Sequence, residues 1–169
     1  MTSHLDPGRF IAYSLGLMTQ PTSLPTSGRW ELAAAFLLLR LFLALRALMS
    51  ALEKFELGGS YSFENYSANM TRMATGITGA SFLPLWATKA FALPLGYILL
   101  VLGAALLLGL KTRLTLFIMG LLYVALAFGL MAVQQGDGVA WLGVYLGLVV
   151  AALVLVRYDH FAVWPDKHD

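Results

Sequence analysis

The sequence lacks cysteine altogether and holds only three histidines among its 169 residues. Without cysteine the chain forms no disulfide, uses no thiolate in catalysis, and holds no iron–sulfur cluster or haem through cysteine. The histidines are His4, His160 and His168, which all lie near the chain ends and outside the long apolar stretches. Histidine ligation of a haem within those stretches is therefore excluded as well.

Charge is also scarce, because only 12% of the residues are charged while 59% are hydrophobic. Soluble domains carry roughly 25% charged residues. A soluble fold of this composition would leave much apolar surface in water, at about 25 cal/mol per Å². The composition therefore predicts a membrane protein, and the small net charge of +2 argues against nucleic acid as a partner.

Four apolar runs have the length of a membrane-spanning helix, which needs roughly 20 residues to cross the hydrocarbon core. Because the runs are continuous and do not alternate with polar residues, they favour helices over the strands of a barrel. We therefore expect an all-α, integral membrane four-helix bundle over residues 30–158. Its spans are predicted at residues 32–52, 90–110, 114–133 and 139–156.

The segments between and around the spans are predicted to be polar. Residues 1–29 form an arm in the cytoplasm or at the membrane surface, residues 53–89 a long extracytoplasmic loop, and residues 159–169 a cytoplasmic tail. The loop either carries function or covers the mouth of the bundle. Pro94 is expected in the first turn of its helix, where its missing N–H costs little.

Orientation follows from the excess of Lys and Arg on one side of the membrane. The side of both termini holds Arg9, Arg29, Lys111, Arg113, Arg157 and Lys167, whereas the opposite side holds Lys54, Arg72 and Lys89. Both termini are therefore expected in the cytoplasm, in the inner (cytoplasmic) membrane of a bacterium or archaeon.

Arg40 is the most informative side chain, because it lies near the middle of the first apolar run. An arginine at mid-membrane costs roughly 2.5–3.5 kcal/mol on insertion scales and usually faces the bundle interior. Ala44, Ala47 and Ala51 fall on the same face of the helix and permit close helix packing. Arg40 is thus expected to point into the bundle.

A partner for Arg40 is not evident, since no acidic residue lies within the other three predicted spans. The tyrosines Tyr97, Tyr123 and Tyr145, one in each of those spans, are candidates, as are backbone carbonyls, lipid, a ligand or another subunit. Two interpretations stay open. Arg40 lines a polar pocket for a quinone head group or an anion, or it ties the helices together.

Three further features accompany Arg40. Lys54 is either a cation at the mouth of such a pocket or a head-group anchor, and Arg46 is interpreted as structural, reaching toward Glu53. Gly143 and Gly147 form a G-x-x-x-G pattern, which marks a close-packing face toward the bundle or toward another protein. No phosphate loop, zinc spacing or nucleophile–base pair is present, so we expect neither catalytic nor metal-binding residues.

The chain resembles the DoxX-like membrane proteins, which include the DoxD-type small subunit of thiosulfate:quinone oxidoreductase. The resemblance covers about residues 30–156 and is carried by three stretches: 39–55 with Arg40 and Lys54, 103–114 with Thr112 and Arg113, and 63–84. It implies a four-helix bundle that stands beside redox partners. The acidic residue that the family often has early in its second helix is missing around Gly96-Tyr97.

These observations predict a transmembrane subunit of a larger redox complex with no cofactor of its own, in contact with lipids and other membrane subunits. We expect it to contribute to a pocket for a bound quinone or phospholipid. The alternative is a structural or lipid-binding accessory subunit. A small transporter is the third hypothesis, weakened because charged residues are confined to the first span.

Overall fold

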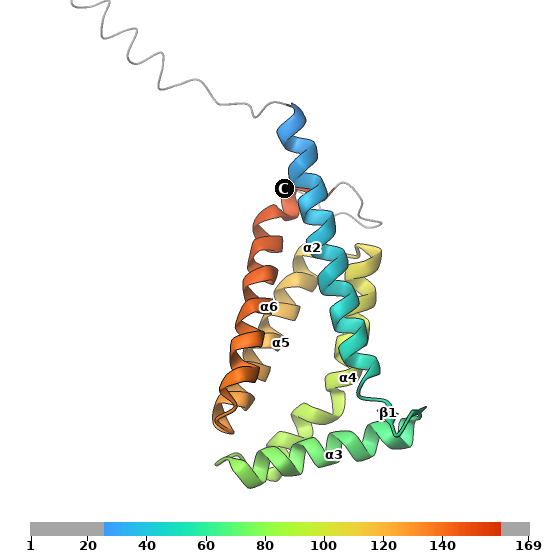
Figure 1. The fold of residues 1–169 in the computed structure, drawn as a ribbon, viewed down its shortest axis with the longest axis vertical. Coiled ribbons are helices and arrows are strands. Elements are labelled where there is room, and N and C mark those ends of the chain that lie inside the picture. The colour runs from blue at the N-terminus through green and yellow to red at the C-terminus, as the bar shows by residue number, and fades with distance from the viewer. Residues whose placement is uncertain (1–25, 160–169) are drawn as a thin grey trace, which may run out of the picture.

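A computed structural model describes residues 26–159, and four long helices make up most of this part of the chain (Figure 1). Each is long and apolar enough to cross a membrane. The predicted all-α four-helix bundle is confirmed, and the chain is a multi-pass membrane protein by the length and composition of its helices. The helices are α2 (Thr26–Leu52), α4 (Leu85–Leu108), α5 (Thr112–Ala132) and α6 (Gly136–Leu155).

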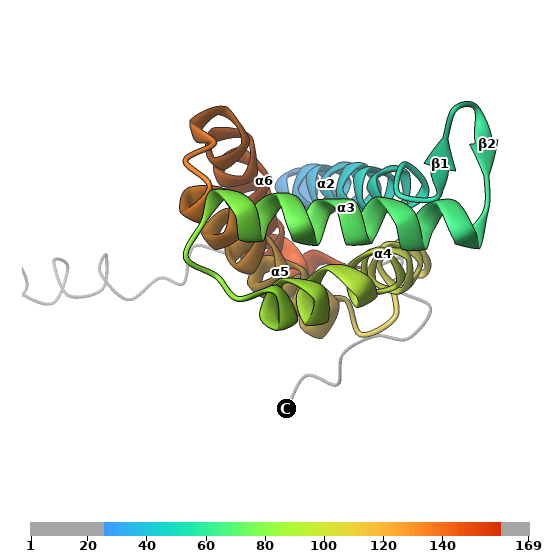
Figure 2. The same ribbon diagram turned by 90° about the horizontal axis from the view of Figure 1, so that it is seen from below.

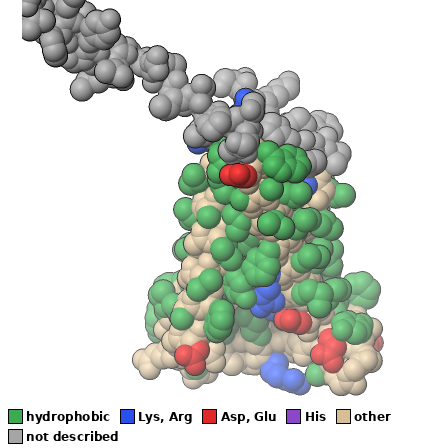
Figure 3. All heavy atoms as spheres, turned by 45° about the horizontal axis from the view of Figure 1, so that its top comes forward, with side chains coloured by type: hydrophobic (Ala, Val, Ile, Leu, Met, Phe, Trp, Pro, Cys, Tyr) green, Lys and Arg blue, Asp and Glu red, His purple; other side chains and the backbone are tan. Residues whose placement is uncertain are grey.

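The side chains on the outside of the bundle are those expected of a membrane-facing surface. Figure 3 shows hydrophobic side chains over the middle of one face, with the few charged side chains lying mainly toward its two ends. Large apolar side chains such as Val101, Phe117 and Val154 are more than half exposed. In water this would be unfavourable, whereas a bilayer solvates such a surface.

The helices pair unequally. α2 packs mainly on α4, α5 packs mainly on α6, and α6 also contacts α2, whereas α4 and α5 share less surface although they are consecutive. The α2–α4 contact is close at Gly103, where a Cβ would lie 2.9 Å from Leu48 Cγ. Ala44, Ala47 and Ala51 are buried in the same core.

The predicted loop between the first two spans is largely structured. It contains a hairpin of β1 (Glu56–Leu57) and β2 (Ser60–Tyr61), followed by the helix α3 (Phe63–Ala80). Gly58 and Gly59 form the two-residue turn with φ of 60° and 82°, a conformation that favours glycine at both positions. The Ser62 hydroxyl then caps α3 by accepting a hydrogen bond from the Asn65 N–H at 3.0 Å.

α3 lies across one end of the bundle, transverse to the spans (Figures 1 and 2). Its inner face is made by Tyr66, Met70 and Ala74, which are buried against the bundle. Of the two interpretations of the long connection, the structure thus shows the cover over the bundle end.

α4 begins earlier than the apolar run indicated, at Leu85 instead of residue 90. Pro94 is therefore inside the helix as its tenth residue, and the prediction that it lies in the first turn is wrong. The polar residues Thr88 and Lys89 had ended the apolar run, but Thr88 is buried against α3 and does not end the helix.

α4 bends, as Figure 1 shows, between the part beside α3 and the part along α2. A proline bends a helix because it removes one backbone N–H and its ring pushes the preceding turn away. The Tyr66 hydroxyl inserts at this bend: it donates to the Leu93 carbonyl and accepts from the Gly96 N–H at 3.1 Å. α3 thereby satisfies backbone groups of α4 beside Pro94.

Residues 1–25 of the predicted arm and residues 160–169 of the predicted tail lie outside the described residues. α2 already includes Thr26 to Arg29, which the sequence analysis assigned to the arm. After α6 the chain forms a short 3-10 helix, η1 (Val156–Tyr158), that leads to Asp159.

Candidate functional site

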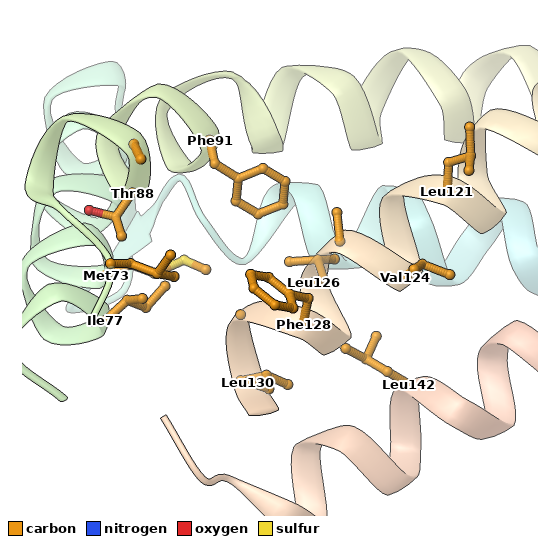
Figure 4. Close-up of a pocket in the computed structure, with 14 residues that line it drawn as sticks. Met73, Ile77, Thr88, Phe91, Leu121, Val124, Leu126, Phe128, Leu130 and Leu142 are labelled. Carbon is orange, nitrogen blue, oxygen red and sulfur yellow. The ribbon is translucent and has the colours of Figure 1, made fainter. Parts of the chain in front are cut away.

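An apolar cavity of about 710 Å³ lies among α3, α4, α5 and α6 (Figure 4). Its volume falls within the range of about 300–1,000 Å³ that is usual for small-molecule sites. The lining includes side chains from all four helices, among them Met73, Ile77, Phe91, Leu121, Phe128 and Leu142.

Thr88 is the one polar side chain in the cavity wall. Its hydroxyl lies 2.8 Å from the Thr78 hydroxyl and 3.1 Å from the Leu85 carbonyl, which accepts its hydrogen bond. Because this group is already paired within the protein, the wall offers apolar contact only. Such a wall suits a hydrocarbon chain.

The bend in α4 explains why a cavity opens here. Beside Pro94 the first half of α4 follows α3, so it leaves α5 and creates the space between them. Gly129 of α5 also lines this space, and nothing lies within 4 Å of the position that its Cβ would occupy. The cavity is thus a consequence of the Tyr66–Pro94 arrangement and of small residues on α5.

A second, smaller chamber of about 90 Å³ adjoins the cavity. Leu126 and Leu142 line both spaces, so the two lie next to each other. The chamber differs in chemistry, because its wall carries the polar side chains of Arg46, Ser50, Lys54, Tyr123 and Tyr145.

Arg46 lies between α2 and α6, with its side chain 35% exposed. Its Nε donates to the Tyr145 hydroxyl at 3.2 Å and its Nη1 donates to the Ser50 hydroxyl at 2.7 Å. Tyr145 is the tenth of the twenty residues of α6, so this guanidinium is at mid-height of that helix. Its carbon also lies 5.4 Å from the centre of the Tyr145 ring, a favourable cation–π distance.

The carboxylate nearest to this guanidinium is that of Glu53, at 3.8 Å from Nη1. The Glu53 side chain is 66% exposed, so solvent or head groups weaken its interaction with Arg46. Arg46 does reach toward Glu53 as the sequence suggested, but its closest partners are Tyr145 and Ser50.

Lys54 follows the end of α2 and lies at the edge of the chamber, half-buried. Burial lowers the pKa of its ammonium group; the charge of Glu53 opposes this shift and the charge of Arg46 adds to it. The Lys54 ammonium makes no salt bridge within residues 26–159. Its carbonyl accepts a hydrogen bond from Asn69 at 3.2 Å, which ties this position to α3.

Of the predicted pocket residues, the structure brings Lys54, Tyr123 and Tyr145 together, but around Arg46 and not around Arg40. Tyr97 lies elsewhere, in an aromatic cluster with Phe55 and Tyr66, whose rings are 5.8 and 4.8 Å away. The pairing of Arg46 with Ser50, one helical turn later, was the available sequence signal for this chamber.

Arg40 is buried and lies near the middle of the first span, as the sequence indicated. Its neighbours come from the ends of other helices, since its Nη2 lies 3.5 Å from the carbonyl of Leu107, the next-to-last residue of α4. Its Nη1 is 2.8 Å from Asp159 Oδ1, and Thr112 donates to Asp159 Oδ2 at 2.7 Å. The partner thus comes from just beyond the fourth span, so it is not among the residues of the predicted spans.

Gly143 and Gly147 are exposed, and no atom lies within 4 Å of a Cβ placed at either. Within residues 26–159 this face of α6 therefore packs on no other helix. No three His, Cys, Asp and Glu side chains of the described residues cluster as metal ligands. Scans against protein-family models, curated proteins and solved structures each found no match to the chain.

Proposed function

We propose that this protein is a membrane subunit that binds a lipid-soluble amphiphile from the bilayer, without a redox cofactor of its own. The observation that carries the proposal is an apolar cavity next to a polar chamber, with two lining residues in common, within a membrane-spanning bundle. An amphiphile has both parts: a hydrocarbon chain for the wall of Phe91, Phe128 and Leu142, and a polar head for Arg46 and Tyr145. Quinones and phospholipids are the two ligand classes that the sequence analysis raised.

The resemblance to DoxX-like proteins supports placing the subunit beside the redox partners of a larger complex. The uncovered face at Gly143 and Gly147 favours such a contact, because small residues let another membrane helix approach closely. In this proposal the protein supplies the lipid-facing site, while its partners supply the cofactors and the chemistry.

Filling the cavity tests the proposal. The variant Gly129→Phe places a ring in the cavity wall, at a position where nothing lies within 4 Å of the new Cβ. We expect the purified variant to retain about tenfold less bound lipid or quinone than the unmodified protein, an affinity loss of about 1.4 kcal/mol. Solvent extraction followed by mass spectrometry measures the amount bound per protein.

Gly143→Phe is the matched control, because it adds the same ring to an exposed position on α6 that lines neither space. It is expected to retain the normal amount of ligand. Equal retention by the two variants, with both folded as judged by circular dichroism, would show that the cavity does not hold the ligand and would refute the proposal.

We further propose that both termini face the cytoplasm of a bacterial or archaeal cell and that α3 lies on the outer side of the cytoplasmic membrane. The Lys and Arg distribution supports this orientation. The absence of cysteine allows a direct test with single-cysteine variants at exposed positions, Gly76→Cys on α3 and Lys111→Cys in the α4–α5 turn.

A membrane-impermeant maleimide is expected to label Gly76→Cys in intact spheroplasts, and Lys111→Cys only after the membrane is permeabilised. The physical reason is that the two positions lie at opposite ends of the bundle (Figure 1). The reverse pattern would place the termini outside.

A further inference from the structure

The polar chamber carries an excess of positive charge, which restricts the ligand. Arg46 and Lys54 bring two cations to its wall, and the one neighbouring carboxylate, Glu53, is mostly exposed. Both cations are partly buried, since the Arg46 side chain is 35% exposed and Lys54 is half-buried. To the extent that a cation is withdrawn from water, it needs an anion or hydrogen-bond acceptors to compensate it. A ligand with a negative head group would complete this compensation, whereas a neutral head group would leave the charge excess in place.

The chamber also presents hydrogen-bond donors that the described protein does not use. Within residues 26–159, no hydrogen bond is made by Arg46 Nη2, by the Lys54 ammonium or by the Tyr123 hydroxyl. Guanidinium and ammonium groups are donors only, so their natural partner is an acceptor such as a carboxylate oxygen. Three donors thus line one small space: one from α2, one from α5 and one from the segment that follows α2.

The size of the chamber limits the head group further. The chamber has about 90 Å³ of space, against about 710 Å³ for the adjoining apolar cavity. A carboxylate is the most compact anionic head group of a lipid and therefore suits the smaller space. The larger apolar space has ample room for a hydrocarbon chain.

Resting on the proposed function, we infer that the ligand is a long-chain fatty acid, bound with its carboxylate in the chamber of Arg46, Lys54 and Tyr123 and its chain in the apolar cavity. The carboxylate oxygens accept hydrogen bonds from the guanidinium and the ammonium. The hydrocarbon chain passes Leu126 and Leu142, which line both spaces, and contacts Phe91 and Phe128.

Photo-crosslinking to the purified full-length protein tests this inference. The probes are a palmitic acid and a hexadecanol of the same chain length, each with a diazirine near the chain end. We expect competition with unlabelled palmitate to show at least about tenfold tighter binding of the acid than of the alcohol. Crosslinked peptides should map to the cavity residues of α3 and α5.

Substitutions then assign the head-group site. Arg46→Gln and Lys54→Gln are each expected to reduce the preference for the acid about tenfold, and Tyr123→Phe to reduce it several-fold while keeping the ring. Arg72→Gln is the control, since it removes a charge from the exposed face of α3 and should leave the preference unchanged. Circular dichroism identifies the variants that fold. If Arg46→Gln does not fold, Tyr123→Phe still tests the head-group site.

Equal binding of acid and alcohol would overturn the fatty-acid assignment, as would tighter binding of a lysophosphatidic acid of the same chain length. In either case the crosslinks would still map to the cavity, so the proposed lipid-binding function would stand. Crosslinks that map outside the cavity, and that Gly129→Phe does not reduce, would refute both.

Discussion

Arg40→Ala is expected to lower the free energy of unfolding of the purified protein by roughly 3–5 kcal/mol, the cost of breaking a buried ion pair. The Arg40 and Asp159 side chains are only 5% and 8% exposed, and their charged atoms are 2.8 Å apart. Removing the guanidinium leaves the Asp159 carboxylate buried with the Thr112 hydroxyl as its remaining described partner. Unfolding in detergent, followed by circular dichroism, measures the change.

A double variant distinguishes the stability that the ion pair contributes from the cost of leaving one buried charge without its partner. Arg40→Met combined with Asp159→Leu removes both charges, so it should be clearly more stable than Arg40→Ala. Arg72→Ala, at an exposed position of α3, is the control and should change stability by less than about 0.5 kcal/mol. If Arg40→Ala unfolded like this control, the ion pair would not support the bundle.

The second large effect is expected at Gly96, where α3 and α4 meet. A Cβ at this position would lie 2.5 Å from Cε2 of the Tyr66 ring, closer than carbon atoms approach one another. In a helix, alanine is favoured over glycine by about 1 kcal/mol. The clash opposes this gain, and overpacking of a core position costs about 1–3 kcal/mol.

Gly96→Ala also displaces the Tyr66 hydroxyl from the Leu93 carbonyl and the Gly96 N–H, which leaves backbone groups beside Pro94 unsatisfied. We therefore expect a net loss of at least about 2 kcal/mol, together with faster proteolysis within α3 because that helix loses its anchor. Thermal unfolding and limited proteolysis measure the two effects.

Gly143→Ala is the matched control, since it is also a helix position but has no atom within 4 Å of the new Cβ. It should be neutral or slightly stabilising. Tyr66→Ala should relieve the clash, so the two substitutions at Tyr66 and Gly96 should be strongly non-additive. Equal stability of Gly96→Ala and Gly143→Ala would contradict the close approach of Tyr66.

α3 shows how much of the structure between the first two spans could be predicted from the sequence. Its buried positions Tyr66, Met70, Ala74 and the half-buried Met73 and Ile77 recur every three or four residues, as on one face of a helix. The stretch contains no long apolar run, because polar residues separate its apolar ones, so the length criterion that identifies the spans does not identify this helix. The helix was therefore predictable, whereas the packing of its Tyr66 against Gly96 was not.

The sequence by itself determined the four spans and the all-α class, because crossing a bilayer depends on local properties: the length of an apolar run and internal hydrogen bonding of its backbone. Only the tertiary structure decided which side chains meet. Arg40 pairs with a residue 119 positions away, and Arg46 with Tyr145, 99 positions away. Such pairs depend on how the helices extend past one another and where α4 bends, and apolar runs of similar composition do not encode that geometry.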